Sequence, residues 1–155
     1  MYRGFFCKGA CMEEVVTEIT IEAEPEKVWA LIVDIPKWSE WSPIINRSAG
    51  SGELGAQLSI TMCSKTEGLD GPKYRPKIIE IDPARRLRWR AKMLAEFIFT
   101  NDKILELEKT NSGTKLIHKE LFGGFMGKRM CSGKMKENVA KMLDRMNQAL
   151  KQTAE

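Results

Sequence analysis

Histidine is almost missing from this sequence of 155 residues, which contains only one, and long apolar runs are also scarce. The longest apolar run, Val28–Val33, is too short to cross a bilayer, so no stable membrane insertion is expected. The four cysteines form no CxxC pair, and no secretory signal precedes them. Reduced thiols and a cytoplasmic location are therefore expected.

The first residues show no pattern of a folded element. We expect residues 1–12 to be a disordered extension of a single domain that spans residues 13–153. Cys7 and Cys11 could in principle hold a metal, but two sulfurs alone do not define a site, and the only histidine, His118, is far away in the sequence. The sequence therefore predicts no metal and no cofactor.

Positive charge is in mild excess, with a formal net charge of +4. The densest cationic group, Arg85, Arg86, Arg88 and Arg90, alternates with apolar residues, which indicates the solvated face of a strand. A nucleic-acid interface needs clustered cations together with exposed aromatic residues, so no nucleic-acid partner is expected. Nothing in the sequence requires an obligate oligomer, and we expect a monomer or a weak dimer.

Alternation of apolar and polar residues predicts a half-buried strand over Val15–Ala23. A helix is predicted to begin at Pro25 and to end at Ile35, and Pro36–Trp41 predicts a second short helix. Six further strands follow, at Ile44–Ser48, Ala56–Cys63, Tyr74–Ile81, Arg86–Met93, Phe97–Glu108 and Thr114–Phe122, with a loop at Lys65–Lys73.

The last predicted element is a long helix near Met126–Lys151, where apolar residues recur at steps of three and four. Consecutive strands with one apolar and one polar face indicate an antiparallel sheet, and only this helix is large enough to cover the apolar face. The sequence thus predicts an α+β helix-grip fold. Its curved antiparallel sheet of six to seven strands wraps around the long C-terminal helix, with two short helices after the first strand. A gap between sheet and helix is the place for a ligand.

Five segments, taken in order and spacing, resemble the polyketide cyclase/dehydrase and lipid-transport branch of the START/Bet v 1-like (SRPBCC) superfamily. The segments are Ala23-Glu-Pro25-Glu-Lys-Val28-Trp29, Trp38-x-x-Trp41-x-Pro43, Tyr74-Arg75-Pro76, Asp82-Pro83-x-Arg85-Arg86-Leu87-x-Trp89 and Gly113-Thr114-x-Leu116-x-His118-x-Glu120. The resemblance covers the chain from about Val15 to Thr153. It implies a helix-grip fold and a cavity for a hydrophobic or amphipathic small molecule or lipid. It implies no particular reaction and no catalytic residue.

A polar group is predicted on the inner face of two paired strands. The turn at Asn111–Gly113 suggests that Leu107 pairs with Leu116, which places Leu105 opposite His118 and Lys103 opposite Glu120. Lys103, His118 and Glu120 would then project into the gap, where they orient a ligand's polar end or act as acid and base. The alternative is a structural Lys103–Glu120 ion pair with His118 hydrogen-bonded nearby.

Methionine is abundant, with nine residues, and its flexible thioether fills irregular space. Met142 and Met146, deep in the helical stripe, are predicted to pack in the core, and Trp38 to seal one end of the barrel. Gly123–Gly127 and Gly68–Pro72 could gate access to the cavity. The predicted ligand-binding residues are Trp41, Tyr74, Trp89, Lys103, Leu105, His118, Glu120, Phe122, Met126, Met130 and Met135.

Gly50, Gly52 and Gly55 match the spacing of a dinucleotide-binding fingerprint, but strands flank them on both sides and no helix opens after them. We interpret the glycines as a tight turn. Hydrolysis by a Ser/His/Asp triad is not supported either, because no nucleophile-elbow motif is present.

Three functions remain open from the sequence. The leading one is binding or transport of a hydrophobic small molecule or lipid in an internal cavity. The second is an enzyme of the cyclase, aromatase or dehydratase type, with His118 or Glu120 as base and Lys103 or Tyr74 stabilising an enolate. The third is an interaction module whose cavity has collapsed.

Overall fold

The computed structural model of the chain describes residues 12–64 and 69–155. Residues 1–11, with Cys7 and Cys11 and most of the predicted N-terminal extension, lie outside the described residues. Among the described ones, no group of three His, Cys, Asp or Glu side chains is placed to hold a metal ion. The elements in chain order are β1 (Glu13–Ile21), α1 (Pro25–Val33), the 3-10 turn η1 (Ile35–Lys37), α2 (Trp38–Trp41), β2 (Ile45–Ala49), β3 (Ser59–Cys63), β4 (Asp70–Tyr74), β5 (Lys77–Asp82), β6 (Arg86–Met93), β7 (Phe99–Thr110), β8 (Gly113–Gly123), α3 (Gly124–Met130) and α4 (Lys134–Ala154).

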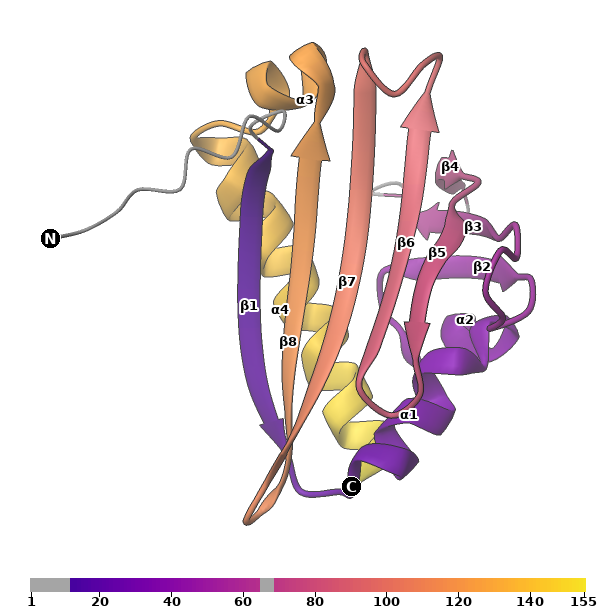
Figure 1. Cartoon of the computed structure of the whole chain (residues 1–155), viewed down its shortest axis with the longest axis vertical. Coiled ribbons are helices and arrows are strands. Elements are labelled where there is room, and N and C mark those ends of the chain that lie inside the picture. Colours follow the sequence, from indigo (N-terminus) through magenta and orange to yellow (C-terminus); the bar gives the residue numbers. More distant parts are fainter. Residues whose placement is uncertain (1–11, 65–68) are drawn as a thin grey trace, which may run out of the picture.

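Two antiparallel sheets enclose the interior. The large sheet has the strand order β1-β8-β7-β6-β5, and the small sheet has the order β2-β3-β4. A β-bridge between Gln57 and Lys77 links the segment before β3 to β5. In Figure 1, α4 runs diagonally behind the large sheet, while α1, α2 and the small sheet lie beyond β5 and β6. The predicted α+β helix-grip fold is confirmed.

The described residues form eight strands, against the predicted six to seven, because a segment expected to be a loop also forms a strand. Tyr74–Ile81 was expected to be continuous, but β4 ends at Tyr74 and β5 begins at Lys77. Pro76 lacks an N–H for ladder pairing, and its carbonyl oxygen instead accepts a hydrogen bond from the Leu58 amide at 2.8 Å. The segment expected to be a loop, Lys65–Lys73, contributes the first residues of β4.

The long helix is also divided. A continuous helix near Met126–Lys151 was expected, but α3 ends at Met130 and α4 begins at Lys134. Gly133 adopts a φ of +49°, a conformation that interrupts a right-handed helix and that glycine tolerates best. The break lets α4 start in a new direction across the sheet. None of the helices within the described residues has the length and hydrophobicity needed to cross a bilayer.

Local sequence explains the elements that carry the core. Pro25 occupies the first turn of α1, where its missing N–H is not needed. Gly50 and Gly55 have φ values of +119° and +83° and lie between β2 and β3, so the glycine-rich segment is a turn between strands, as predicted.

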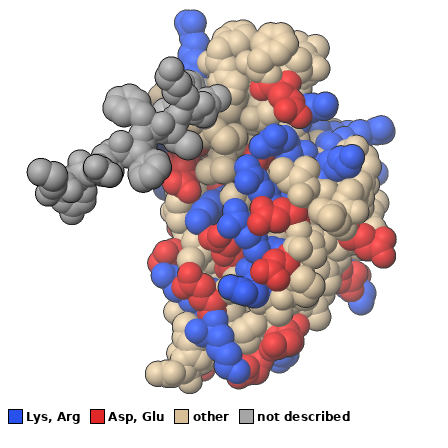
Figure 2. Space-filling model, in the orientation of Figure 1, with Lys and Arg blue, Asp and Glu red and all other residues tan. Residues whose placement is uncertain are grey.

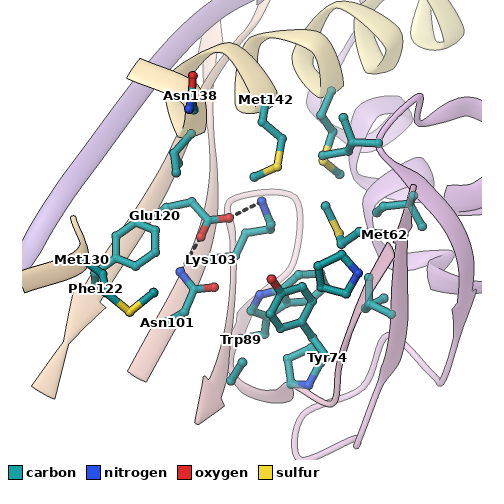
Figure 3. A pocket seen from close by; sticks show the side chains of 18 of the residues that line it. Met62, Tyr74, Trp89, Asn101, Lys103, Glu120, Phe122, Met130, Asn138 and Met142 are labelled. Carbon is teal, nitrogen blue, oxygen red and sulfur yellow. Dashed lines mark hydrogen bonds and ion pairs between the residues drawn. The ribbon is translucent and has the colours of Figure 1, made fainter. Parts of the chain in front are cut away.

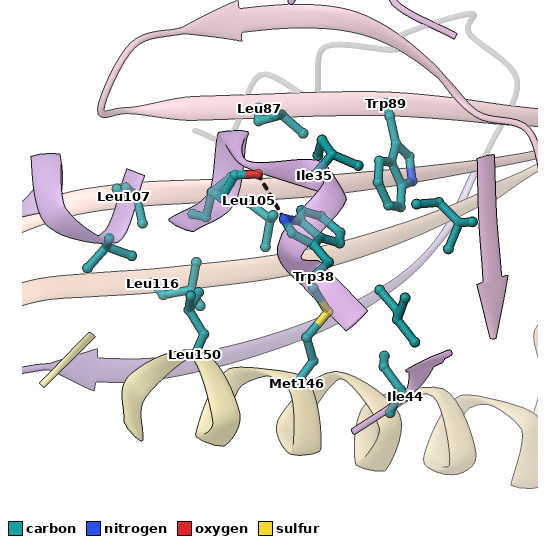
Figure 4. Packing of buried hydrophobic residues seen from close by; sticks show 14 of the residues in the cluster. Ile35, Trp38, Ile44, Leu87, Trp89, Leu105, Leu107, Leu116, Met146 and Leu150 are labelled. Atoms are coloured by element: carbon teal, nitrogen blue, oxygen red, sulfur yellow. Dashed lines mark hydrogen bonds between the residues drawn. The ribbon is translucent and has the colours of Figure 1, made fainter. Parts of the chain in front are cut away.

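Trp38 lies at the centre of the main hydrophobic cluster and has no exposed surface. Its indole Nε1 donates hydrogen bonds to the carbonyl oxygens of Leu31 and Ile32, at 3.2 and 3.0 Å. Its ring packs against that of Trp41 at a centroid distance of 5.9 Å. It also packs against that of Trp89 at 5.2 Å (Figure 4). Trp38 therefore joins α2 to the large sheet, and its role in sealing one end of the barrel stays a prediction.

The outer face of the large sheet is charged but locally neutral. Arg88 and Arg90 both bind Asp102, whose side chain is fully buried beneath them, and Arg86 binds Glu106 at 2.7 Å. Lys and Arg are interspersed with Asp and Glu over this face (Figure 2). Of the four arginines predicted to form a simple solvated strand face, Arg86, Arg88 and Arg90 are only partly exposed because carboxylates on β7 bind them. Arg85 precedes β6 and is exposed, as predicted.

Candidate ligand-binding cavity

A cavity of about 460 Å³ lies between the large sheet, the small sheet and α4. Its volume falls within the usual range for small-molecule sites, roughly 300–1,000 Å³. Most of its wall is apolar (Figure 3). The lining residues are Ile44, Ile45, Ile60, Met62, Pro72, Tyr74, Pro76, Trp89, Ala91, Phe99, Asn101, Lys103, Glu120, Phe122, Met130, Met135, Asn138, Val139, Met142 and Met146.

The pairing of β7 with β8 places the polar side chains in this wall. Leu107 pairs with Leu116, Leu105 with His118 and Lys103 with Glu120, so the register predicted from the turn is confirmed. Side chains two residues apart on a strand share a face, so Asn101 and Lys103 point the same way as Glu120.

Lys103 and Glu120 form a buried ion pair in the cavity wall. The Lys103 Nζ lies 2.6 Å from Glu120 Oε1, and both side chains are almost completely covered. The amide of Asn101 donates a hydrogen bond to Glu120 Oε2. The ammonium also lies over the Trp89 ring, 5.9 Å from its centroid. Each oxygen of the carboxylate therefore has a donor, and the pair is held in one geometry.

His118 lies behind this pair and does not line the cavity. Its Nε2 is 2.8 Å from Lys103 Nζ, and its Nδ1 is 2.7 Å from Asn147 Oδ1. Because an ammonium only donates, Nε2 must accept, and Nδ1 carries the proton that is donated to Asn147. Asn147 in turn donates to the Thr17 hydroxyl at 2.8 Å. Complete burial, and secondarily the Lys103 charge, hold the pKa of His118 well below its usual 6.5, partly offset by Asn147.

This burial predicts a stability loss in mild acid. Below pH 6.5 the unfolded chain protonates His118 while the folded chain does not, so unfolding gains a proton and the free energy of unfolding falls. The slope from this residue is at most about 1.4 kcal/mol per pH unit. Urea unfolding at about pH 7.5, 6.5 and 5.5 measures it. The His118→Gln variant should show a flatter profile, and equal slopes for the two proteins would refute the assignment.

Tyr74 supplies a further polar group at the cavity. Its ring lines the wall from the end of β4, and in Figure 3 its hydroxyl points to the side where Asn101 and Lys103 lie. Burial, and then the negative charge of Glu120, raise the pKa of the Tyr74 phenol above its usual 10.0. The phenol is therefore protonated at neutral pH and can donate a hydrogen bond into the cavity.

The predicted ligand-binding residues divide into two groups. Seven of them line the cavity: Tyr74, Trp89, Lys103, Glu120, Phe122, Met130 and Met135. Four do not: Trp41, Leu105, His118 and Met126. Leu105 and His118 share the inner face, but they lie further along the strands, where the core fills the space under α4. Trp41 packs beside Trp38 in that core. Of the described side chains of α3, only that of its last residue, Met130, reaches the cavity. Binding by the seven lining residues stays a prediction.

Several lining residues were not predicted. Met142 and Met146 pack in the core, as expected, but both also line the cavity from α4. Asn101 could have been found, because it lies two residues before Lys103 on the same strand face. Asn138 likewise lies one helical turn before Met142. The small-sheet residues Ile60 and Met62 carried no such signal, because their placement depends on how that sheet folds over the cavity.

Half-exposed side chains surround the mouth of the cavity. Tyr74, Met130 and Met135 are 42%, 45% and 39% exposed while also lining it. The first predicted gating segment, Gly123–Gly127, forms the end of β8 and the first turn of α3. Of the second, Gly68 lies outside the described residues, and Pro72 lines the cavity. Gating by either segment stays a prediction.

A curved antiparallel sheet and a long terminal helix that enclose an apolar cavity define a helix-grip protein. The sequence model of the family described as polyketide cyclase / dehydrase and lipid transport matches residues 12–155. The chain belongs to this family. No curated protein matches the sequence significantly.

Solved structures share the fold at low sequence identity. Ara h 8.0201 has a TM-score of 0.71 at 18% identity, covering 93% of this chain and 98% of that one. A norcoclaurine synthase point mutant from Thalictrum, in complex with a transition-state analogue, has a TM-score of 0.65 at 11% identity, with coverages of 94% and 96%. The di-domain ARO/CYC StfQ from the steffimycin biosynthetic pathway has a TM-score of 0.68 at 9% identity. This chain is covered to 92% and spans 49% of StfQ. At these identities the similarity establishes the fold alone.

Proposed function

We propose that the protein binds or carries a hydrophobic or amphipathic small molecule in the cavity beside α4. The observation that supports this most directly is the size and composition of the cavity, about 460 Å³ with a mostly apolar wall and one small polar cluster. Such a cavity removes apolar ligand surface from water, and each Å² of surface removed contributes roughly 25 cal/mol of favourable free energy. A cavity of this volume argues against the interaction module with a collapsed interior.

Methionines support the binding of ligands of varied shape. Met62, Met130, Met135, Met142 and Met146 contribute thioether side chains from the small sheet, α3 and α4. These chains have three rotatable bonds and adjust to different outlines at low energy. Membership of a family that includes lipid transport is consistent with this function.

Filling the cavity should abolish binding. Ala91 lines the cavity from β6, and Ala91→Phe puts a ring into the space that a ligand would occupy. The neutral fluorophore N-phenyl-1-naphthylamine should bind to the wild-type protein with a rise in emission, and the Ala91→Phe variant should lose affinity at least about tenfold.

Ala30→Phe is the matched control, because Ala30 is exposed on α1, away from the cavity. This variant should bind the fluorophore as the wild-type protein does, and circular dichroism checks that both variants are folded. If the wild-type protein does not bind the fluorophore, or if Ala91→Phe binds it unchanged, the proposed function is wrong.

An enzyme of the cyclase, aromatase or dehydratase type is the second candidate. It is favoured by the presence of Tyr74, Lys103 and Glu120 in one wall, which could polarise a carbonyl and accept a proton. His118 is poorly placed as the base, since both of its ring nitrogens are engaged and it does not reach the cavity. Glu120 is the remaining candidate base, but its two oxygens already accept hydrogen bonds. Binding without chemistry therefore agrees better with the geometry.

A further inference from the structure

We infer that the cavity selects uncharged ligands with a hydroxyl or carbonyl group and rejects carboxylates of the same shape, with Glu120 as the residue that sets this preference. This inference rests on the proposed function, because it specifies which molecules the cavity binds. It is carried by the charges in the wall and by their hydrogen bonds.

The described wall of the cavity has no net charge. Lys103 and Glu120 are its only charged residues, and their side chains are in contact at 2.6 Å. The other polar groups in the wall are the neutral side chains of Tyr74, Asn101 and Asn138. A ligand that enters therefore meets one cation whose charge is already balanced.

A carboxylate would bind weakly at this wall, because the hydration that it loses is not replaced by interactions with the wall. Moving an ion out of water is strongly unfavourable unless an opposite charge compensates it. Lys103 cannot provide that compensation, since its ammonium is shared with Glu120, and the carboxylate of Glu120 repels a second anion beside it. A ligand cation is no better placed, because both oxygens of Glu120 already accept hydrogen bonds.

The carboxylate of Glu120 cannot easily turn away to release Lys103. Asn101 binds its second oxygen from the neighbouring strand, and the pairing of Lys103 with Glu120 across β7 and β8 fixes both backbones. On its other side, Lys103 is held by His118, which Asn147 of α4 fixes in turn. The neutral state of the wall is thus maintained by residues from both strands and from the helix.

An uncharged oxygen does find a partner there. The Lys103 ammonium has three N–H groups, and described residues accept from it at His118 Nε2 and Glu120 Oε1, which leaves one N–H for a ligand. The Tyr74 hydroxyl and the carbonyl oxygen of Asn101 provide a further donor and acceptor at the same wall. A hydroxyl or carbonyl group satisfies these atoms without bringing a charge into the cavity.

A matched pair of ligands tests the inference. The compounds 2-naphthalenemethanol and 2-naphthoate share one ring system, and the second is fully ionised at about pH 8. Each is titrated against the protein loaded with N-phenyl-1-naphthylamine, and displacement is followed by the loss of emission. The wild-type protein should bind the alcohol at least about tenfold more tightly than the carboxylate.

Changing the charge of the wall should remove this preference. Glu120→Gln keeps the shape of the side chain and leaves Lys103 as an unbalanced cation, so the affinity for 2-naphthoate should rise at least about tenfold. The double variant Lys103→Met/Glu120→Gln restores a neutral wall, and the carboxylate should again bind more weakly than the alcohol. Circular dichroism establishes that each variant is folded.

The outcomes separate the inference from the function. Three outcomes overturn the inference: equal displacement by the two ligands, tighter binding of the carboxylate to the wild-type protein, or displacement by neither. In each of them, binding of the fluorophore still upholds the function. No binding of the fluorophore overturns the function itself. A folded Glu120→Gln variant whose affinity for 2-naphthoate is unchanged also overturns the inference. If that variant does not fold, the comparison of the two ligands on the wild-type protein still tests the preference itself.

Discussion

Lys103→Met should lower the free energy of unfolding by about 3–5 kcal/mol, because it leaves the carboxylate of Glu120 buried without a cation. Glu120 is only 4% exposed, so little water reaches its carboxylate to replace the lost ammonium. His118 also loses its donor at Nε2. Urea unfolding at neutral pH measures the change as a lower midpoint with an unchanged slope.

An exposed lysine provides the control for this variant. Lys73 pairs with Asp70 at 3.7 Å with 68% of its side chain exposed, so Lys73→Met should change stability by less than about 1 kcal/mol. Adding Glu120→Gln to Lys103→Met removes the unpaired charge and should recover much of the loss. A single Lys103→Met variant that is as stable as the Lys73→Met variant would show that the pair contributes nothing.

Trp38→Ala should destabilise the fold by about 3–5 kcal/mol, the range measured when large buried aromatic side chains are truncated. The ring has no exposed surface and fills the space between α2 and the large sheet. Trp38→Phe separates the two contributions of this residue. It keeps much of the ring packing but loses the hydrogen bonds to Leu31 and Ile32, and should be intermediate.

Thermal unfolding provides the measurement for both Trp38 variants, and Trp29→Ala is the comparison. Trp29 is only partly buried on α1, so its truncation should have a smaller effect than that of Trp38. Equal losses for the two positions would contradict the central role of Trp38 in the core. Because Trp38 packs against Trp89, which lines the cavity, Trp38→Ala should also weaken binding of the fluorophore.

The sequence predicted correctly what depends on short-range geometry. The turn at Asn111–Gly113 fixes how β7 and β8 pair, and period-two alternation then assigns Lys103 and Glu120 to the inner face. The same alternation assigned His118 to that face, which is also correct. It could not show that the cavity ends before His118, because that boundary is set by Asn147 on α4, distant in sequence.

Long-range placement explains the other differences. β4 contains Gly71 and Pro72, residues that are depleted in strands, and it forms only because β3 pairs with it. The sequence around Gly133 does not indicate that this residue divides a helix. Both features determine which side chains reach the cavity, so the apolar wall from the small sheet could not be predicted from local pattern.

The pairing of β1 with β8 has a consequence for synthesis of the chain. Among the described residues, β1 pairs with no strand other than β8, from Glu13 with Phe122 to Ile21 with Thr114. On the ribosome, the amphipathic strand β1 at the start of the domain therefore has no partner strand until nearly all of the domain has emerged. Chains dominated by such distant contacts fold slowly, and unpaired strands are prone to aggregate. The protein is thus expected to depend on chaperones during synthesis more than a helical bundle of similar length would.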